Sequence, residues 1–219
     1  MDRFGYVKTV DKPTYDRNAE TIQAESKYVF RCMNTDKICL FTDTGKMHTA
    51  KVLDLPFGKF RDKGVPIDNF SNFSSADEEM LFVASMESVK NGNILFATGK
   101  SMIKQVEGAT FDVAKRTIAA TKLMEDDKVL LVGLADVMDY VVMQSGEGYF
   151  LRFLVEEVPV KKKGAVGVRG MKIGKTGIVE NAYLVANRME YAISYKDKEV
   201  ILNKLKLAKR DTKGTKVRV

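Results

Sequence analysis

The chain has 219 residues, 45% of them apolar and 30% charged, and a formal net charge of +7. This is the balance of a globular protein with a core, and no apolar run approaches the ~18–20 residues of a membrane span. Two cysteines (Cys32, Cys39) and one histidine (His48) exclude a disulfide scaffold and a Cys/His zinc module. The N-terminal MDRFGYVKTV has no apolar stretch, so we expect no secretory signal.

Positive charge is concentrated in the last quarter of the chain. Residues 1–159 carry 20 basic and 24 acidic side chains, whereas residues 160–219 carry 16 basic and 5 acidic ones. This asymmetry indicates a polyanionic partner, nucleic acid or a membrane surface, and is also compatible with a solvated charged face.

Four pairs of short apolar runs begin at residues 28, 80, 129 and 179, with a polar or Gly-containing link inside each pair. We predict a β-hairpin from each pair, about every 50 residues. The pairs are Tyr28–Met33 with Ile38–Thr42, Met80–Met86 with Ile94–Thr98, Val129–Ala135 with Tyr140–Gln144, and Val179–Val185 with Tyr191–Tyr195.

A short strand is predicted after a turn at five further places, at Gly5, Gly45, Ser101, Gly148 and Lys198. Helix signals are weak: Ala19–Ser26 is one candidate, and Val200–Lys209 is a second for which we favour a strand.

A basic segment lies 12–16 residues beyond each of these turns, and we predict a loop at each. These loops are Arg17, Arg61–Gly64, Lys115–Arg116, Lys161–Gly164 and Lys209–Gly214. The Gly-rich run 164–170 is typical of a twisted, bulged strand and equally of backbone close to phosphates.

The repeat predicts an all-β fold, a propeller-like disc of about five four-stranded units that form one domain over residues 1–219. Neighbouring units would cover the faces that one unit cannot bury alone.

Other motifs carry no chemistry that we can identify. Ala97–Ser101 and Gly174–Thr176 resemble the end of a phosphate-binding loop but lack its first glycine. The acidic clusters Asp77–Glu79 and Glu125–Asp127 are predicted to be solvated loop tips. We expect His48 to be a surface or hydrogen-bonded residue, the cysteines to be buried thiols, and no catalytic or metal site.

Two segments resemble blades of the C-terminal domain of the A subunits of bacterial DNA gyrase and topoisomerase IV. They are ICLFTDTGKMHTAKVLDLPFGKFRDKGVPI (38–67) and VVMQSGEGYFLRFLVEEVPVKKKGAVGVRGMKI (141–173), and the opening RFGYVKTV resembles that domain's first strand. The resemblance implies a β-pinwheel, a disc whose blades exchange a strand with their neighbours and whose basic rim binds and bends duplex DNA.

The chain departs from the gyrase pattern in two respects. The glutamine–arginine–glycine–lysine box is absent from the matching segment, Tyr15–Ser26, and we count five units where gyrase discs usually have six. Both departures favour a topoisomerase IV-like parent or a gyrase that lacks the box.

The resemblance implies binding of duplex DNA, and basic loops without interleaved aromatic pairs predict that this binding is independent of sequence. The charge asymmetry predicts that it is strongest around Lys161–Lys172 and Lys206–Arg218 and weakest around Arg17. The implied partners are duplex DNA, the ATPase B subunit, and the rest of the A subunit, with no membrane and a cytoplasmic, nucleoid-associated location. The breakage-reunion domain would lie outside this chain, and ATP and Mg would belong to other parts of the parent type II topoisomerase.

The alternative function is a propeller-like protein-interaction scaffold. The predicted DNA contacts are Lys46, Lys59, Arg61, Lys63, Lys100, Lys104, Lys115, Arg116, Lys161, Lys162, Lys163, Arg169, Lys172, Lys209, Arg210, Lys213, Lys216 and Arg218.

Overall fold

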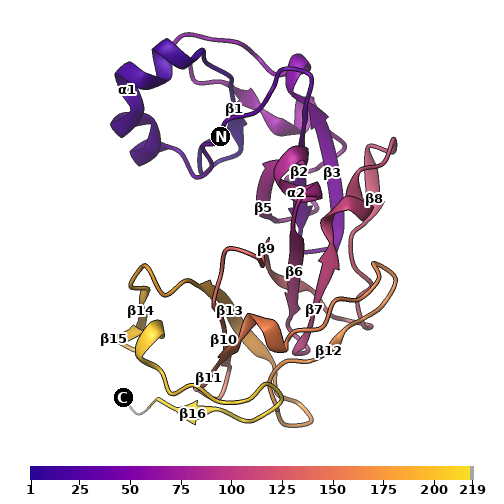
Figure 1. Ribbon diagram of the computed structural model, residues 1–219, viewed down its shortest axis with the longest axis vertical. Helices are drawn as coiled ribbons and strands as arrows, with labels where there is room; N and C mark the ends of the chain where they lie inside the picture. The colour runs from indigo at the N-terminus through magenta and orange to yellow at the C-terminus, as the bar shows by residue number, and fades with distance from the viewer. Residues whose placement is uncertain (218–219) are drawn as a thin grey trace.

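Short β-strands make up most of the ordered elements in the computed structural model, which describes residues 1–217. In Figure 1 the sheets follow one another around an arc, from β1 near the N-terminus to β14 and β15 near the C-terminus. The strands are β1 (Tyr6–Val7), β2 (Lys37–Thr42), β3 (Lys46–Lys51), β4 (Val65–Pro66), β5 (Met80–Ser85), β6 (Asn93–Thr98), β7 (Met102–Glu107), β8 (Thr117–Ala119), β9 (Val129–Leu134), β10 (Tyr140–Ser145), β11 (Tyr149–Leu154), β12 (Val168–Arg169), β13 (Val179–Val185), β14 (Ala192–Tyr195), β15 (Lys198–Ile201) and β16 (Thr215–Lys216), with helices α1 (Lys12–Glu25) and α2 (Met86–Lys90).

The predicted all-β, propeller-like class is confirmed, with units of two sizes. Three sheets have four antiparallel strands, in the orders β5-β2-β3-β8, β12-β7-β6-β9 and β13-β10-β11-β16. The first and last units are the two-stranded pairs β1–β4 and β14–β15. We number these sheets one to five along the chain, beginning with β1–β4.

The hairpins of the structure do not connect the apolar runs that we paired in the sequence analysis. The tight hairpins are β2–β3, β6–β7, β10–β11 and β14–β15, so four of the five predicted post-turn strands are second arms of hairpins. The fifth, β1 after Gly5, pairs with β4 instead. The runs 80–86, 129–135 and 179–185 pair with the preceding hairpins instead, because β5, β9 and β13 lie beside β2, β6 and β10. The predicted hairpin pairing was therefore wrong, whereas these strands themselves are present.

The outer strand of each four-stranded sheet comes from the next repeat. β8 follows β7 in sequence but pairs with β3, β12 follows β11 but pairs with β7, and β16 follows β15 but pairs with β11. β4 pairs with β1 in the same way. The chain thus exchanges one strand at every step of the arc.

The hydrophobic core lies between consecutive sheets. Phe41 of the second sheet packs edge-to-face against Phe96 of the third sheet and Phe111 of the 3₁₀ helix after β7, at centroid distances of 5.9 and 5.4 Å. Equivalent clusters lie at the other three interfaces. Because both faces of the hairpin strands are covered, their apolar residues run continuously instead of alternating.

Residues 12–33 differ from the sequence prediction. The segment expected to be a loop is mostly α1, which begins after the Asp11 cap with Pro13 in its first turn and is kinked at Asn18. Our helix candidate Ala19–Ser26 overlaps the second half of α1. No residue of α1 is buried, so no apolar stripe marks its full length. Residues 28–33 form no strand, contrary to our prediction. Likewise, Leu202–Lys204 is a short 3₁₀ helix within the segment 200–209, for which we favoured a strand.

A buried polar cluster joins the strands of the second sheet. The Glu78 carboxylate, 5% exposed, accepts hydrogen bonds from the hydroxyls of Thr42 (2.7 Å) and Thr44 (2.6 Å) and from His48 Nε2 (3.1 Å). His48 Nδ1 forms a hydrogen bond with the hydroxyl of Thr117 in β8 at 3.0 Å. We predicted that Asp77–Glu79 would be a solvated loop tip, and this prediction is wrong for Glu78. His48 is hydrogen-bonded, as expected.

We predict that Gly108→Ala destabilises the protein by about 3 kcal/mol or more. A Cβ at Gly108 would lie 1.7 Å from the Val89 carbonyl oxygen and 2.4 Å from that of Gly92, so α2 would have to move. Gly164→Ala is the matched control because nothing lies within 4 Å of its Cβ position. Chemical denaturation measures both changes, and equal effects would contradict the close packing at Gly108.

We also predict that Glu78 makes stability depend on pH in acid. Burial alone would raise the pKa of Glu78, but the hydrogen bonds from Thr44, Thr42 and His48 outweigh it and lower the pKa to about 2. A carboxyl with a lowered pKa in the folded state stabilises fully above its ordinary pKa of 4.5, and this contribution is lost as pH falls toward 2.

The measurement is the free energy of unfolding at several pH values between 6 and 2.5. Relative to Glu78→Gln, the wild-type protein should lose on the order of 2–3 kcal/mol between pH 4.5 and 2.5. Glu79→Gln, at an exposed neighbouring position, should keep the wild-type pH profile. Parallel profiles for the wild type and Glu78→Gln would show that Glu78 contributes nothing to acid sensitivity.

Candidate nucleic-acid interface

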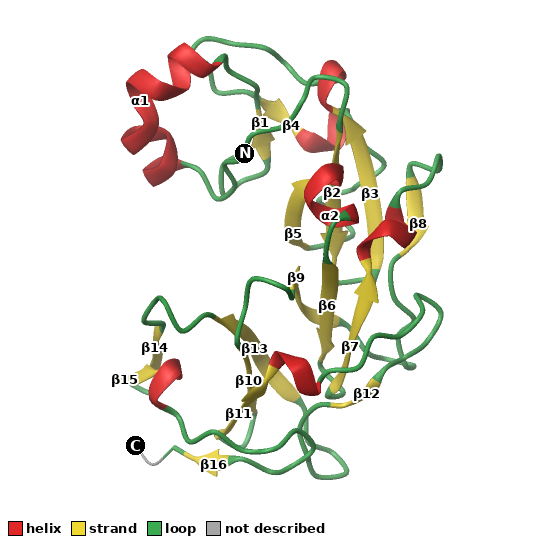
Figure 2. Ribbon diagram, viewed as in Figure 1, coloured by secondary structure: helices red, strands yellow, loops and turns green. Residues whose placement is uncertain are grey.

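The basic loops lie where the chain crosses from one sheet to the preceding one. Apart from the segment around Arg17, which lies on α1, each loop begins after a short 3₁₀ helix and ends at an exchanged strand, β4, β8, β12 or β16. In Figure 2, β8, β12 and β16 lie on the convex side of the arc, whereas β5, β9 and β13 lie toward its concave side. The strand exchange therefore brings these loops to the outer rim.

Backbone contacts hold the start of three of these loops against the neighbouring sheet. A parallel bridge joins Thr9 to Phe57, Gln105 to Val160 and Arg152 to Leu207. Each bridge attaches the start of a loop to β1, β7 or β11, or to the residues just after it, so the three loops begin with the same backbone contact. The attachment of the loops therefore repeats about every 50 residues, as the sheets do.

Successive loops also contact one another along the rim. The Lys122 amide, just beyond β8, donates to the Lys163 carbonyl at 3.1 Å. The Asp211 amide donates to the Gly170 carbonyl at 2.7 Å, and the Lys172 amide donates to the Thr212 carbonyl at 2.9 Å. The third, fourth and fifth loops, with the exchanged strands beside them, form one surface that we call the basic band (residues 112–122, 160–172 and 206–216).

Most of the predicted contact residues are exposed. Thirteen of the eighteen have exposed side chains, three are half-buried and one is buried, and Arg218 lies outside the described residues. The exposed residues are Lys46, Lys59, Arg61, Lys63, Lys115, Arg116, Lys161, Lys162, Arg169, Lys172, Lys209, Lys213 and Lys216.

Four of these exposed cations have an acidic partner. Arg169 forms two hydrogen bonds with Asp211, which lower the pKa of that carboxyl. The others are Lys46–Glu78 (3.4 Å), Arg116–Asp54 (3.8 Å) and Lys213–Glu147 (3.9 Å). The remaining nine have no ion pair within residues 1–217: Lys59, Arg61, Lys63, Lys115, Lys161, Lys162, Lys172, Lys209 and Lys216.

Lys104 does not face solvent, which corrects its prediction as a DNA contact. It is 1% exposed, and Nζ donates to the carbonyls of Lys162, Lys163 and Ala165 at 3.0, 2.9 and 2.6 Å. Burial lowers the pKa of Lys104 to about 8, so it is still mostly an ammonium group at neutral pH. Lys104 supports the fourth loop from inside.

The three half-buried cations also bind the protein itself. Lys163 donates to the Thr110 carbonyl and lies 5.4 Å from the centre of the Phe111 ring. Arg210 donates to the carbonyls of Glu157 and Arg169, and Lys100 donates to the Glu125 carbonyl. These side chains order the rim, and Lys161 and Lys162 are the free cations of the fourth loop within the described chain.

The residue that sequence reasoning missed is Lys122, which is exposed and lies beside the fourth loop through its amide bond to Lys163. The two residues are 41 positions apart, and only the strand exchange brings them together. No sequence signal marks this contact. Arg17, by contrast, lies exposed on α1, where its Nε donates to the Pro13 carbonyl.

Comparison with known proteins supports the resemblance seen in the sequence. The family model of the DNA gyrase C-terminal domain, a β-propeller, matches residues 92–134 and 139–186. The chain is 29% identical over 184 residues to the gyrase A protein of Lawsonia intracellularis, a match that covers 79% of this chain and 22% of that protein. It is 25% identical over 232 residues to the topoisomerase 4 A protein of Streptococcus pneumoniae, covering 99% and 28%.

The solved structures agree with these sequence matches. A crystal structure of the C-terminal domain of DNA topoisomerase IV superposes with a TM-score of 0.81 and 25% identity, covering 96% of this chain and 69% of that one. The predicted family is confirmed. The chain is related to the C-terminal domains of gyrase and topoisomerase IV A subunits.

A second solved structure has the same fold, and the curated relatives are much longer than this chain. The Escherichia coli ParC C-terminal domain has the same fold, with a TM-score of 0.75 at 17% identity over 100% of this chain and 92% of that one. The chain spans less than a third of the length of the two curated relatives described above. Within residues 1–217, no helix has the length and apolarity needed to cross a membrane.

We predict that Lys104→Met lowers the melting temperature and speeds amide exchange in residues 161–166. The substitution leaves three carbonyl groups of the loop without their ammonium donor, and an unsatisfied buried polar group costs about 1–3 kcal/mol. Lys115→Met is the control, because Lys115 is exposed and has no ion pair in the described chain. If both variants melt together with the wild type, Lys104 does not support the loop.

Proposed function

We propose that this chain binds duplex DNA along the basic band without reading its bases. The observation that carries the proposal is the continuity of the band, in which hydrogen bonds join the third, fourth and fifth loops while Lys115, Lys161, Lys162, Lys172, Lys209 and Lys216 have no ion pair in the part described. Cations of this kind suit phosphates, which fix the position of a duplex and carry no sequence information.

The curvature of the rim supports a bent path for the bound duplex. The exchanged strands β8, β12 and β16 follow the convex side of the arc, so a duplex that contacts all three loops has to curve with it (Figure 2). Bending ~20–30 base pairs costs on the order of 1–6 kcal/mol, which several phosphate contacts must offset. The band would do this by contact alone, with no covalent step.

We further propose that the chain is the C-terminal part of the A subunit of a type II topoisomerase. Its partners would be the ATPase B subunit, together with the remainder of its own subunit, and these parts would hold the cleavage chemistry and use ATP and Mg. The domain would select the DNA segment presented to the cleavage site. The lack of the gyrase box, where this chain has α1, supports a topoisomerase IV-like parent or a gyrase without the box.

We predict that the double substitution Lys161→Glu/Lys162→Glu weakens duplex binding far more than Arg17→Glu. Both lysines are exposed and unpaired in the described chain, whereas Arg17 lies on α1, outside the basic band. Each phosphate contact adds about 0.9 to the slope of log K against log salt, so the double variant should lower that slope by about 2.

The measurement is a titration of a duplex of about 30 base pairs at two salt concentrations, with thermal melts to confirm folding. Single-stranded DNA of equal length should compete less well than duplex. Equal losses for the two variants would place the contact outside the fourth loop. A wild-type protein with no salt-dependent duplex binding would reject the DNA proposal and favour the protein-interaction scaffold.

A further inference from the structure

The turn that leads into β1 repeats the turn inside each complete hairpin. In the three four-stranded sheets, the amide three residues after the first hairpin strand donates back to that strand's last carbonyl: Gly45 to Thr42, Ser101 to Thr98 and Gly148 to Ser145, at 2.9–3.1 Å. The Gly5 amide donates to the Asp2 carbonyl at 3.4 Å in the same way. Asp2 therefore corresponds to Thr42, Thr98 and Ser145, the last residue of the first strand in each complete hairpin.

The register on the other side of that position also repeats. In the second sheet, Thr42 pairs with Met80 and Phe41 with Phe82, across a bulge. In the first sheet, Asp2 pairs with Ser26, and Met1 exchanges two hydrogen bonds with Tyr28 at 2.8 and 3.0 Å. Residues 26–32 therefore correspond to β5, whose residues 83–85 pair with residues 38–40 of β2.

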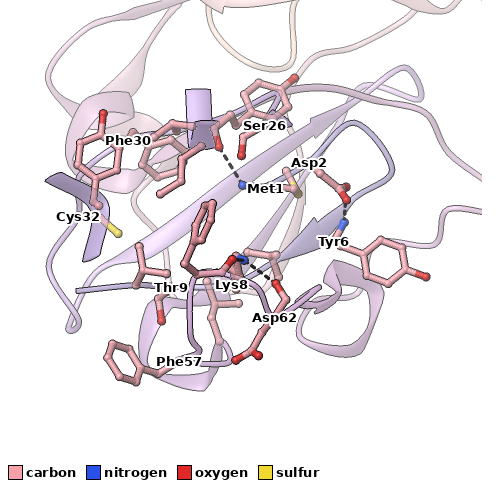
Figure 3. Close-up of a pocket in the computed structure, with 18 of the residues that line it drawn as sticks. Met1, Asp2, Tyr6, Lys8, Thr9, Ser26, Phe30, Cys32, Phe57 and Asp62 are labelled. Carbon is pink, nitrogen blue, oxygen red and sulfur yellow. Dashed lines mark hydrogen bonds between the residues drawn. The ribbon is translucent and has the colours of Figure 1, made fainter. Parts of the chain in front are cut away.

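Beyond Tyr28, the segment that corresponds to β5 has unpaired backbone groups in the described chain. Residues 29–32 make no backbone hydrogen bond within the described chain, and Val29 and Phe30 are each 40% exposed. This edge is one wall of a cavity of about 1410 Å³ whose opposite wall includes β1 and Phe57. Figure 3 shows Phe30 and Cys32 on one side of this groove and Thr9 and Phe57 on the other.

The complete sheets show which chemistry fits this groove. A strand that led into Met1 would place three residues at positions that correspond to the middle of β2, β6 and β10. In every four-stranded sheet these three positions hold apolar residues that are at most 3% exposed. They are Ile38, Cys39 and Leu40; Ile94, Leu95 and Phe96; and Val141, Val142 and Met143. The lining of the groove also includes the apolar residues Ile38 of β2, Val83 of β5 and Val52, together with Tyr15 and Ile22 of α1.

We propose that this groove is a strand-addition site for the polypeptide that leads into Met1, with three consecutive apolar residues entering antiparallel to residues 28–32. The occupant would make the first sheet's hairpin like the other four and bury Val29 and Phe30. The inference rests on the proposal that the chain is part of a longer A subunit. The two curated relatives described above extend far beyond the matched part, since the chain covers only 22% and 28% of them.

The test adds four residues ahead of Met1 and measures amide exchange and melting temperature. The probe extension is Tyr-Val-Val-Met, a copy of residues 140–143, which occupy the corresponding positions in the fourth sheet. Gly-Ser-Gly-Ser and Tyr-Pro-Val-Pro are the length-matched controls, because glycine disfavours an ordered strand and proline cannot donate to its neighbour.

The probe extension should raise the melting temperature and slow exchange of the residue 29–32 amides by about tenfold or more, whereas the controls should leave both unchanged. Equal exchange in the three extended chains would overturn the proposal. Protection that rises with concentration of the unextended chain, together with a dimer in light scattering, would assign the groove to a second copy and also overturn it. Duplex binding measured on the same samples separates the two proposals, since the groove lies on the first sheet, away from the basic band.

Discussion

The hydrogen-bonded exchange of outer strands determines the arrangement of the other elements. β8, β12 and β16 each satisfy the outer edge of a sheet whose hairpin lies one repeat earlier in the chain. An isolated hairpin with one inner strand would expose an unpaired edge and one uncovered face. The exchange covers that edge, and the packing of consecutive sheets buries the faces in four interface clusters.

The same exchange gives the rim its charge pattern. A loop that crosses between sheets is fixed at both ends, so its lysines project without the ordering cost of a free loop. Two lysines that face inward complete the support. Buried Lys104 binds three carbonyls of the fourth loop, and half-buried Lys8, at the corresponding position of the first unit, binds the carbonyls of Phe60 and Asp62 at 2.5 Å. The rim therefore uses one set of cations for contacts within the protein and leaves a second set exposed to solvent.

Sequence reasoning found the period, the post-turn strands and four of the five basic loops, because turn residues and apolar runs are local signals. It assigned the wrong hairpin partners because strand pairing depends on register in space, and each run lies between two candidate partners in the sequence. Charged residues were read as solvent-facing, which failed for Glu78 and Lys104 because their partners lie 30–61 positions away. Only the second half of α1 was found, as the helix candidate Ala19–Ser26, because no residue of α1 is buried and no apolar stripe marks its full length.

Strand exchange also explains why the end units differ from the middle ones. Each four-stranded sheet takes its outer strand from the following repeat, so the fifth sheet, which has no later repeat within residues 1–217, consists of β14 and β15 alone. The first sheet receives β4 from the second repeat, and the segment that follows β1 forms α1 instead of an exchanged strand. The two ends of the arc therefore differ in kind, with an apolar groove at the first sheet and the cationic loop 209–214 before the last strand.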